Sequence, residues 1–296
     1  MDKHSYLVVI NPISGVGSKE YLPHLIAQSL LPYADALYIT YTQGAGHAQR
    51  LMQEAMEQKM DTIIAVGGDG TINEIAASLY NTPIRLGLIP KGSGNGLARA
   101  LGIPIDNEEA ALEIIRKGNS LAIDTGIANG KPFFCTFGVG FDAAVTERYE
   151  DAATRGIFTY IKATIDEYIR FEPKSYLITV DDITIKRQAL LITCANIDQY
   201  GSNAYIAPGA SPSDGLLDLV ILRPVEGLQA AQVAIQLFTK RIRKNARLES
   251  IRGSKITIER AMEGAIQLDG ESFTMGKTIE ISVVPQSLNV LVPAKR

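Results

Sequence analysis

Three short apolar runs in the first hundred residues each end in a glycine-bearing loop. The runs cover residues 6–10, 62–66 and 85–89, and the loops that follow begin NPISG, GGDG and PKGSGNG. Segments with helical apolar spacing separate the runs, and strands that alternate with helices form parallel sheets covered by helices. Ligands of such sheets bind at the carboxyl ends of the strands, where all three loops would meet. The pattern therefore predicts an α/β domain that binds a ligand through glycine-rich loops.

The helix after the second run has the clearest boundaries. Apolar residues from Ile72 onward fall on one face at i, i+3, i+4 and i+7. Thr71 and Glu74 predict a capping box at the start of this helix. A further helix is expected over about 108–117, with Gly118 placed to end it.

The pattern changes after about residue 124, where strand signals follow one another. Asn129-Gly130 lies between two apolar runs and predicts a type I′ hairpin. Only two helical stretches interrupt the strands, near 156–171 and 226–240. Successive strands of this kind predict a mainly antiparallel β-sandwich domain. The expected domains are 1–125 and 126–285, and about 286–296 is a candidate to return to the first domain.

Composition is that of an ordinary soluble globular protein. The net charge is −3, so bulk nucleic-acid binding is not expected. Cys135 and Cys194 form no CxxC pair; one disulfide between them stays open, but reduced thiols are the better prediction. The three histidines have no zinc-ligand spacing. Because neither a signal peptide nor a bilayer-length apolar run is visible, we expect a cytoplasmic protein.

The glycine loops could serve as simple tight turns, but GGDGT favours a phosphate cradle. Glycine lets the backbone approach a ligand closely, and helix N-termini present free N–H groups to anions. Two common phosphate motifs are absent, because residues 15–19 lack the GxxxxGK[ST] spacing and residues 92–97 lack GxGxxG. Neither a P-loop NTPase nor a classical dinucleotide dehydrogenase is therefore predicted.

The loops read NPISG at 11–15, GGDGTINE at 67–74 and PKGSGNGLAR at 90–99. In this order they resemble the motifs of the diacylglycerol kinase catalytic-domain family, which includes bacterial lipid kinases, sphingosine kinases and ceramide kinases. The resemblance covers nearly the whole chain and implies an active site in the cleft between two domains. Further similar segments are TQGAGHA at 42–48, Ile123-Asp124, Asp214-Gly215 with Asp218, and Leu268-Asp269-Gly270-Glu271.

The resemblance implies that the first domain binds ATP. Asn11 and Ser14 would lie near the nucleotide, Thr42 would approach its base or sugar, and Ser93 would hydrogen-bond nearby. Asp69 and Asp124 resemble acids of the family's site, and a carboxylate beside a triphosphate implies Mg²⁺ between them. The residues expected to wrap the phosphates are Gly67, Gly68, Asp69, Gly70, Thr71 and Asn73.

In the second domain the resemblance implies that Asp269 is the general base, supported by Glu271. From the residues alone, Asp-Gly between two strands is an ordinary hairpin turn, and this alternative stays open. A lipid-headgroup contact is implied at Asp142. A structural Mg²⁺ site is also implied, with the Asp214 side chain and the backbone carbonyls of Ser211 and Leu216 as ligands.

A lipid substrate needs an apolar slot and contact with a bilayer. Aromatic and aliphatic residues gather over 133–171, where core packing is the alternative. Residues 240–255 hold seven basic residues against one acid, Glu249. A solvated helix end explains such a run, but on anionic lipid each basic residue adds roughly 1 kcal/mol. We expect peripheral membrane contact through 240–255, and a homodimer is left open.

The predicted function is transfer of the γ-phosphoryl group of ATP to a primary hydroxyl of a lipid, such as diacylglycerol or a sphingoid base, in phospholipid biosynthesis. Gly96 stands where many bacterial diacylglycerol kinases carry Asp, which leaves the acceptor open. One alternative is an NAD kinase, which shares a GGDGT loop and an α/β-then-β layout. Another is a catalytically silent nucleotide- or lipid-binding regulator, against which the intact Asp69, Asp124 and Asp269 argue.

Overall fold

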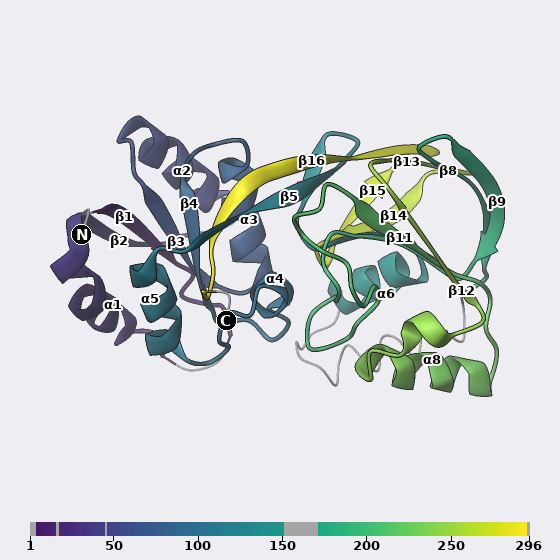
Figure 1. The fold of residues 1–296 in the computed structure, drawn as a ribbon, viewed down its shortest axis with the longest axis horizontal. Helices are drawn as coiled ribbons and strands as arrows, with labels where there is room; N and C mark the ends of the chain where they lie inside the picture. Colours follow the sequence, from purple (N-terminus) through teal and green to yellow (C-terminus); the bar gives the residue numbers. More distant parts are fainter. Residues whose placement is uncertain (1–3, 16–17, 45, 151–170, 295–296) are drawn as a thin grey trace. The chain divides into compact units, whose positions relative to one another are not determined.

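A computed structural model describes residues 4–15, 18–44, 46–150 and 171–294, without the side chains of 149 and 150. The chain divides into two compact units, coloured along the sequence in Figure 1. The helix expected near 156–171 lies outside the described residues, apart from Phe171. Unit 1 comprises Met1–Ile123 and Gln286–Arg296, and unit 2 comprises Asp124–Pro285.

Unit 1 is built on a parallel sheet with the strand order β2-β1-β3-β4. The end of β16 extends this sheet, because Asn289 and Val290 pair in parallel with Arg85 and Leu86 of β4. Strands β1, β3 and β4 are almost entirely buried, as expected of parallel strands with covered faces. The strands are β1 His4–Ile10, β2 Ala34–Tyr41, β3 Thr62–Gly67, β4 Arg85–Pro90 and β16 Thr278–Leu291.

The helices of unit 1 pack on this sheet, with α3 against β3 and β4 and α5 against β4 (Figure 1). In α3 the predicted apolar face is confirmed, since its four members are buried. The helices are α1 Leu22–Leu30, η1 Leu31–Tyr33, α2 His47–Glu57, α3 Asp69–Leu79, α4 Gly96–Ala100 and α5 Glu108–Lys117.

The predicted capping box of α3 is wrong. The helix begins at Asp69, and its N-cap Gly68 offers no side chain. Thr71 therefore lies inside the first turn, where its hydroxyl accepts a hydrogen bond from Asn11 Nδ2 at 2.8 Å. Glu74 accepts a hydrogen bond from the backbone N–H of Gln49 at 3.4 Å instead of closing a box.

Two turn predictions are confirmed. Gly118 follows α5 with φ +69°, the left-handed conformation that ends many helices. Asn129 and Gly130 have φ of 44° and 81°, as a type I′ turn requires. This turn joins β5 (Ser120–Ala128) to β6 (Lys131–Phe133), which pair antiparallel.

Unit 2 contains two antiparallel layers. The first has the order β12-β11-β10-β7-β14-β15, and the second runs β16-β13-β8-β9. The strands of the first layer are β7 Thr136–Gly140, β10 Leu191–Ala195, β11 Leu217–Leu222, β12 Leu248–Gly253, β14 Gly264–Leu268 and β15 Glu271–Met275. Those of the second layer, besides β16, are β8 Lys174–Val180, β9 Ile183–Ala189 and β13 Lys255–Arg260.

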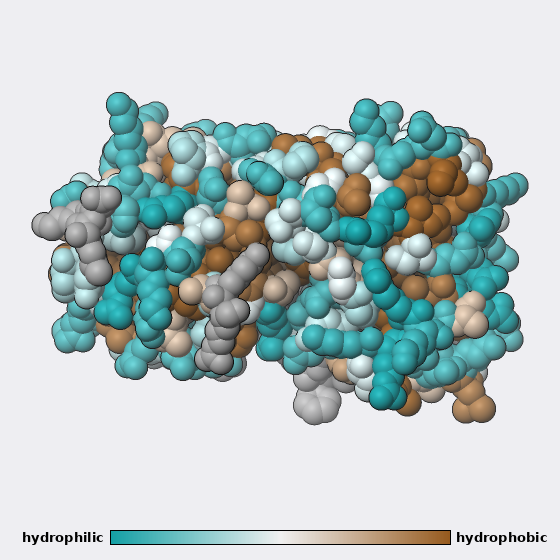
Figure 2. Space-filling model, viewed as in Figure 1, coloured by the Kyte–Doolittle hydropathy of each residue, from teal (hydrophilic) through white to brown (hydrophobic). Residues whose placement is uncertain are grey.

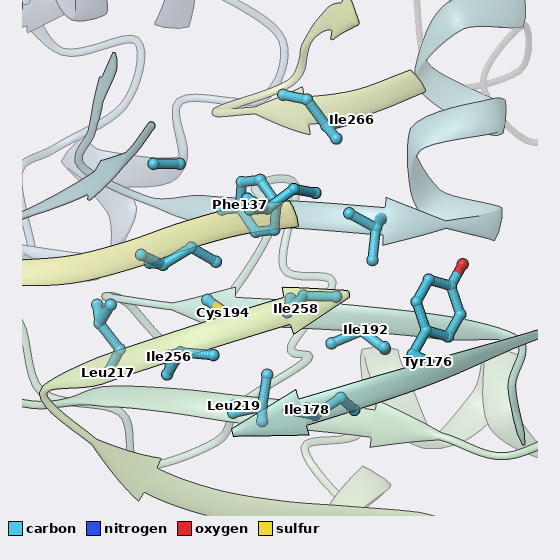
Figure 3. Packing of buried hydrophobic residues seen from close by; sticks show 14 of the residues in the cluster. Phe137, Tyr176, Ile178, Ile192, Cys194, Leu217, Leu219, Ile256, Ile258 and Ile266 are labelled. Atoms are coloured by element: carbon cyan, nitrogen blue, oxygen red, sulfur yellow. The ribbon is translucent and has the colours of Figure 1, made fainter. Parts of the chain in front are cut away.

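The core of unit 2 lies between these layers. Phe137 and Ile192 come from the first layer, and Ile178 and Ile258 from the second; all four belong to one buried cluster (Figure 3). Face-to-face packing of two antiparallel sheets is a sandwich, so the predicted fold class is confirmed. The helical elements among the described residues of the unit are α6 Phe141–Glu150, α8 Leu228–Phe238 and η2 Ile242–Lys244. Among the described residues, no helix is long and apolar enough to span a bilayer.

Candidate functional site

Three loops of unit 1 follow β1, β3 and β4 at the same edge of the sheet, and glycines let them touch. A Cβ on Gly92 would lie 2.7 Å from the Cα of Gly68, and a Cβ on Gly94 would lie 2.7 Å from Asp69 Oδ2. Gly15 has φ +64° and abuts the backbone of Lys91. These glycines therefore serve close approach of loop to loop, which no other residue allows here.

Asp69 ties two of the loops together. Its Oδ2 accepts the N–H of Asn95 at 2.8 Å, and its Oδ1 accepts the N–H of Gly96 at 2.7 Å. Burial raises the pKa of the Asp69 carboxyl, while the Gly96 and Asn95 N–H groups act in the opposite direction. The buried Asn95 side chain in turn accepts the N–H of Gly92 at 2.9 Å. Asp69 is thus placed to fix the loop geometry, and sequence reasoning missed its partner Asn95.

The first loop contains a buried cation that the sequence analysis missed. Lys19 is 7% exposed, and its Nζ donates to the carbonyl oxygens of Pro12, at 3.2 Å, and of Ser14. No described carboxylate pairs with it. Burial lowers the pKa of Lys19, and the nearby Lys91 charge lowers it further. A lysine eight residues after Asn11 was visible in the sequence, but its burial was not.

The other predicted nucleotide residues lie around the same loops. Ser14 Oγ donates to the carbonyl of Asn11 at 3.0 Å, and the Thr42 N–H donates to the carbonyl of Ile10 at 2.9 Å. Asn73 Nδ2 is buried with no hydrogen-bond partner among the described residues. Gly70 is exposed in the first turn of α3, and Ser93 lies in the third loop. An unsatisfied donor and a buried ammonium beside glycine loops fit an anionic ligand.

In unit 2, Asp269 occupies the hairpin turn between β14 and β15. Asp269 and Gly270 have φ of 50° and 86°, so the turn interpretation is confirmed. The carboxylate also accepts three backbone N–H groups: Oδ2 from Phe134 at 2.7 Å, and Oδ1 from Cys135 at 2.7 Å and Thr136 at 2.8 Å. Glu271 is exposed at the start of β15.

Asp124 lies at the first residue of unit 2 and is fully buried. Its Oδ2 accepts the Gly215 N–H at 2.7 Å, and its own N–H donates to the carbonyl of Pro212 at 2.6 Å. Asn196, another buried residue that sequence reasoning missed, donates through Nδ2 to the Asp124 carbonyl at 2.9 Å. Asp124 thus anchors the loop that contains Asp214.

The Asp214 carboxylate is already paired. Arg252 forms an ion pair with the Asp214 carboxylate, and Asp214 Oδ1 accepts the N–H of Leu216 at 3.1 Å. The neighbouring Asp218 is buried and pairs with Arg243 at 2.8 Å and Arg252 at 3.4 Å. Mg²⁺ bound by Asp214, Ser211 and Leu216 would have to share the Asp214 carboxylate with the Arg252 guanidinium. Within the described ranges, no group of three or more His, Cys, Asp or Glu could hold a metal ion.

Asp142 begins a buried polar network at the start of α6. Its Oδ2 accepts from Thr193 Oγ1 at 3.0 Å and from the Tyr200 hydroxyl at 3.4 Å, while its Oδ1 accepts the Ala143 N–H at 2.9 Å. Gly138 leaves the space that this carboxyl fills. Burial raises the pKa of Asp142 to about 7, against the hydrogen bond from Thr193. The group can therefore change protonation near neutral pH.

Comparisons with known proteins match both units. A diacylglycerol kinase catalytic domain matches residues 5–128, and a YegS C-terminal NAD kinase beta sandwich-like domain matches residues 135–292. An uncharacterized protein of Synechocystis sp. is 32% identical to this chain. The matched region covers 97% of this chain and 70% of the Synechocystis protein. A protein of Yersinia pestis named probable lipid kinase YegS-like is 31% identical over 87% of both chains.

Solved structures agree with this match. The structure of a candidate diacylglycerol kinase from Bacillus anthracis str. Sterne has a TM-score of 0.81 at 26% identity and covers 99% of both chains. Another from the same organism, a diacylglycerol kinase, has a TM-score of 0.76 at 22% identity and bears on the fold alone. This chain joins a diacylglycerol kinase catalytic domain to a YegS C-terminal domain, and with these relatives it belongs to the YegS-like lipid kinase family.

Proposed function

We propose that this protein transfers the γ-phosphoryl group of ATP to a primary hydroxyl of a lipid such as diacylglycerol or a sphingoid base. The observation that carries the proposal is the glycine cradle of unit 1. There, loops packed backbone to backbone lie next in sequence to the buried Lys19 ammonium, which donates to the Pro12 and Ser14 carbonyls, and to α3, where Asn73 Nδ2 is unsatisfied among the described residues. Both groups are donors, as phosphate oxygens require, and the cradle belongs to a chain of a lipid kinase family.

In this proposal unit 1 orients the nucleotide. Asp69 fixes the second and third loops through its two backbone hydrogen bonds, so the loop N–H groups are held before the nucleotide arrives. Lys19 and Asn73 supply the donors described above. Mg²⁺ would neutralise the triphosphate, which binds the ion through its own oxygens; the described carboxylates do not form a metal site by themselves.

Unit 2 supplies the proposed general base. As the acceptor oxygen bonds to the γ-phosphorus, the bond to the bridging oxygen of ADP breaks, and the Asp269 carboxylate takes the hydroxyl proton. The three N–H groups from residues 134–136 hold this carboxylate in one orientation. Asp142, with its network of hydroxyls, is the proposed headgroup contact.

An NAD kinase-like activity is the second candidate, because the domain matched over residues 135–292 is described as NAD kinase beta sandwich-like. One assay separates the two functions. Purified protein would be incubated with labelled ATP, Mg²⁺ and either NAD or detergent-dispersed diacylglycerol, sphingoid base, ceramide and undecaprenol, and the products separated by chromatography. A labelled lipid phosphate is the expected product. Phosphorylated NAD, with no lipid labelled, would overturn the proposal.

A further inference from the structure

Helix α8 has an exposed apolar face and contains no charged residue. Leu228, Ile235 and Phe238 are 90%, 65% and 51% exposed. Seven and ten residues separate Leu228 from the other two, which places all three on one side of the helix. In Figure 2 brown side chains project at the edge of unit 2 where Figure 1 labels α8. An apolar cluster of this kind indicates a binding surface.

The opposite side of α8 holds the helix in place. Val233 is buried in the second hydrophobic cluster of unit 2, and Ala230 and Leu237 pack against that cluster. The Leu237 carbonyl also accepts the N–H of Tyr205 at 3.0 Å. The exposed face is therefore fixed on a folded support rather than formed by a loose segment.

Four unpaired basic residues follow directly after this face. Lys240, Arg241, Lys244 and Arg247 are exposed, and none forms an ion pair with a carboxylate in the described part of the chain. Lys240 Nζ lies 4.0 Å from the centroid of the Tyr205 ring. Between residues 227 and 248 the sequence has no Asp or Glu. This positive cluster stands out on a chain whose net charge is −3.

We propose that α8 is a membrane-docking helix whose apolar face enters the surface of an anionic bilayer while Lys240, Arg241, Lys244 and Arg247 contact lipid phosphates. The proposal rests on the proposed function in one respect, because a lipid acceptor is located in a bilayer, which the protein must then contact. An apolar face beside a basic cluster has the charge and hydrophobic pattern of an interfacial helix. A second copy of the chain fits less well, since it would bring four like charges to the contact.

The absence of tryptophan from the chain gives a direct test. Phe238→Trp, and independently Leu228→Trp, would place a single fluorophore on the apolar face, and Ile183→Trp would place one at an exposed position of the β8–β9 hairpin. With vesicles of equal parts phosphatidylglycerol and phosphatidylcholine, we expect emission from the two α8 variants to shift to shorter wavelength and to be quenched by brominated acyl chains. The Ile183→Trp control should not change. Unchanged emission from both α8 variants would overturn the proposal.

Charge variants test the basic cluster. Each basic residue near anionic lipid contributes roughly a fivefold factor in partitioning. Exchange of Lys240, Arg241, Lys244 and Arg247 for Gln should therefore lower the vesicle partition coefficient, measured by sedimentation, roughly 600-fold. A control exchange of Arg50, Lys186 and Lys277 for Gln should change vesicle binding little. An emission shift that depends on protein concentration without vesicles would instead indicate self-association and overturn the bilayer assignment.

Phosphorylation of a water-soluble short-chain diacylglycerol, without bilayers, separates this proposal from the proposed function. The variant with Leu228, Ile235 and Phe238 exchanged for Gln should keep wild-type turnover there and lose vesicle binding. If it binds vesicles like the wild type, the docking proposal fails while the kinase function stands. If the wild type binds vesicles through α8 but phosphorylates no lipid, the docking proposal stands and the proposed function fails.

Discussion

Asp269 combines a structural and a proposed chemical role in one side chain. Asp269→Asn keeps the shape but cannot accept a proton, so turnover should fall by on the order of 10² or more. ATP affinity, measured by calorimetry, should not change, because the cradle lies on unit 1. The Asn amide would also face the Phe134 N–H, which we expect to cost about 1–3 kcal/mol of unfolding free energy. The matched control is Asp182→Asn at an exposed turn. Near-normal turnover of Asp269→Asn would contradict the general-base role and limit Asp269 to its role in the turn.

Asp142 makes the stability of unit 2 depend on pH. Its pKa of about 7 in the folded protein lies above the ordinary value of 3.8. Between pH 4 and pH 7 the folded state therefore holds more protons than the unfolded chain, so the unfolding free energy falls as pH rises through this window. The contribution is at most about 4 kcal/mol. Urea unfolding at pH 5, 6, 7 and 8 should show this decline, and Asp142→Asn should flatten it. A wild-type curve without the decline would contradict the assignment.

At the scale of elements, the phosphate loops depend on glycine for their mutual contact. Gly92→Ala would bring its Cβ to 2.7 Å from the Gly68 Cα, and backbone must move to relieve the overlap. We expect ATP affinity to fall at least about tenfold, or roughly 1.4 kcal/mol. Gly276→Ala is the control, because nothing lies within 4 Å of its added Cβ. Calorimetry showing equal ATP affinity for both variants would refute the loop-contact argument.

Sequence patterns of short range predicted the elements well. Strand–loop–helix alternation, and the positive φ of Asn129 and Asp269, follow from residues that are neighbours along the chain. The start of α3 was misplaced because the helix begins at Asp69, whose carboxylate accepts N–H groups of the next loop, a contact between different loops. The basic run 240–255 predicts a solvated helix end or a lipid contact, yet Arg243 and Arg252 pair with Asp218 and Asp214, respectively 25 and 38 residues away. Burial of Lys19 likewise depends on tertiary packing.

At the scale of the whole molecule, unit 1 is discontinuous in sequence. Its last part, residues 286–296, contributes the end of β16. Leu288, Val290 and Leu291 are almost completely buried, and the Val292 N–H donates to the Asn119 carbonyl at 2.9 Å. The chain must therefore complete unit 2 before the sheet of unit 1 receives its final strand.

Truncation after Pro285 should consequently unfold unit 1 although it removes no proposed site residue. Burial of Leu288, Val290 and Leu291 contributes roughly 5 kcal/mol, which is comparable to the about 5–15 kcal/mol that keeps a domain folded. We expect ATP binding to be lost and limited proteolysis to cut within residues 1–123, while the sandwich core of unit 2 stays protected. Truncation after Pro293 is the control, since it keeps all three buried side chains and the Val292 hydrogen bond. If the chain ending at Pro285 bound ATP with full affinity, the end of β16 would not be part of the fold that supports the cradle.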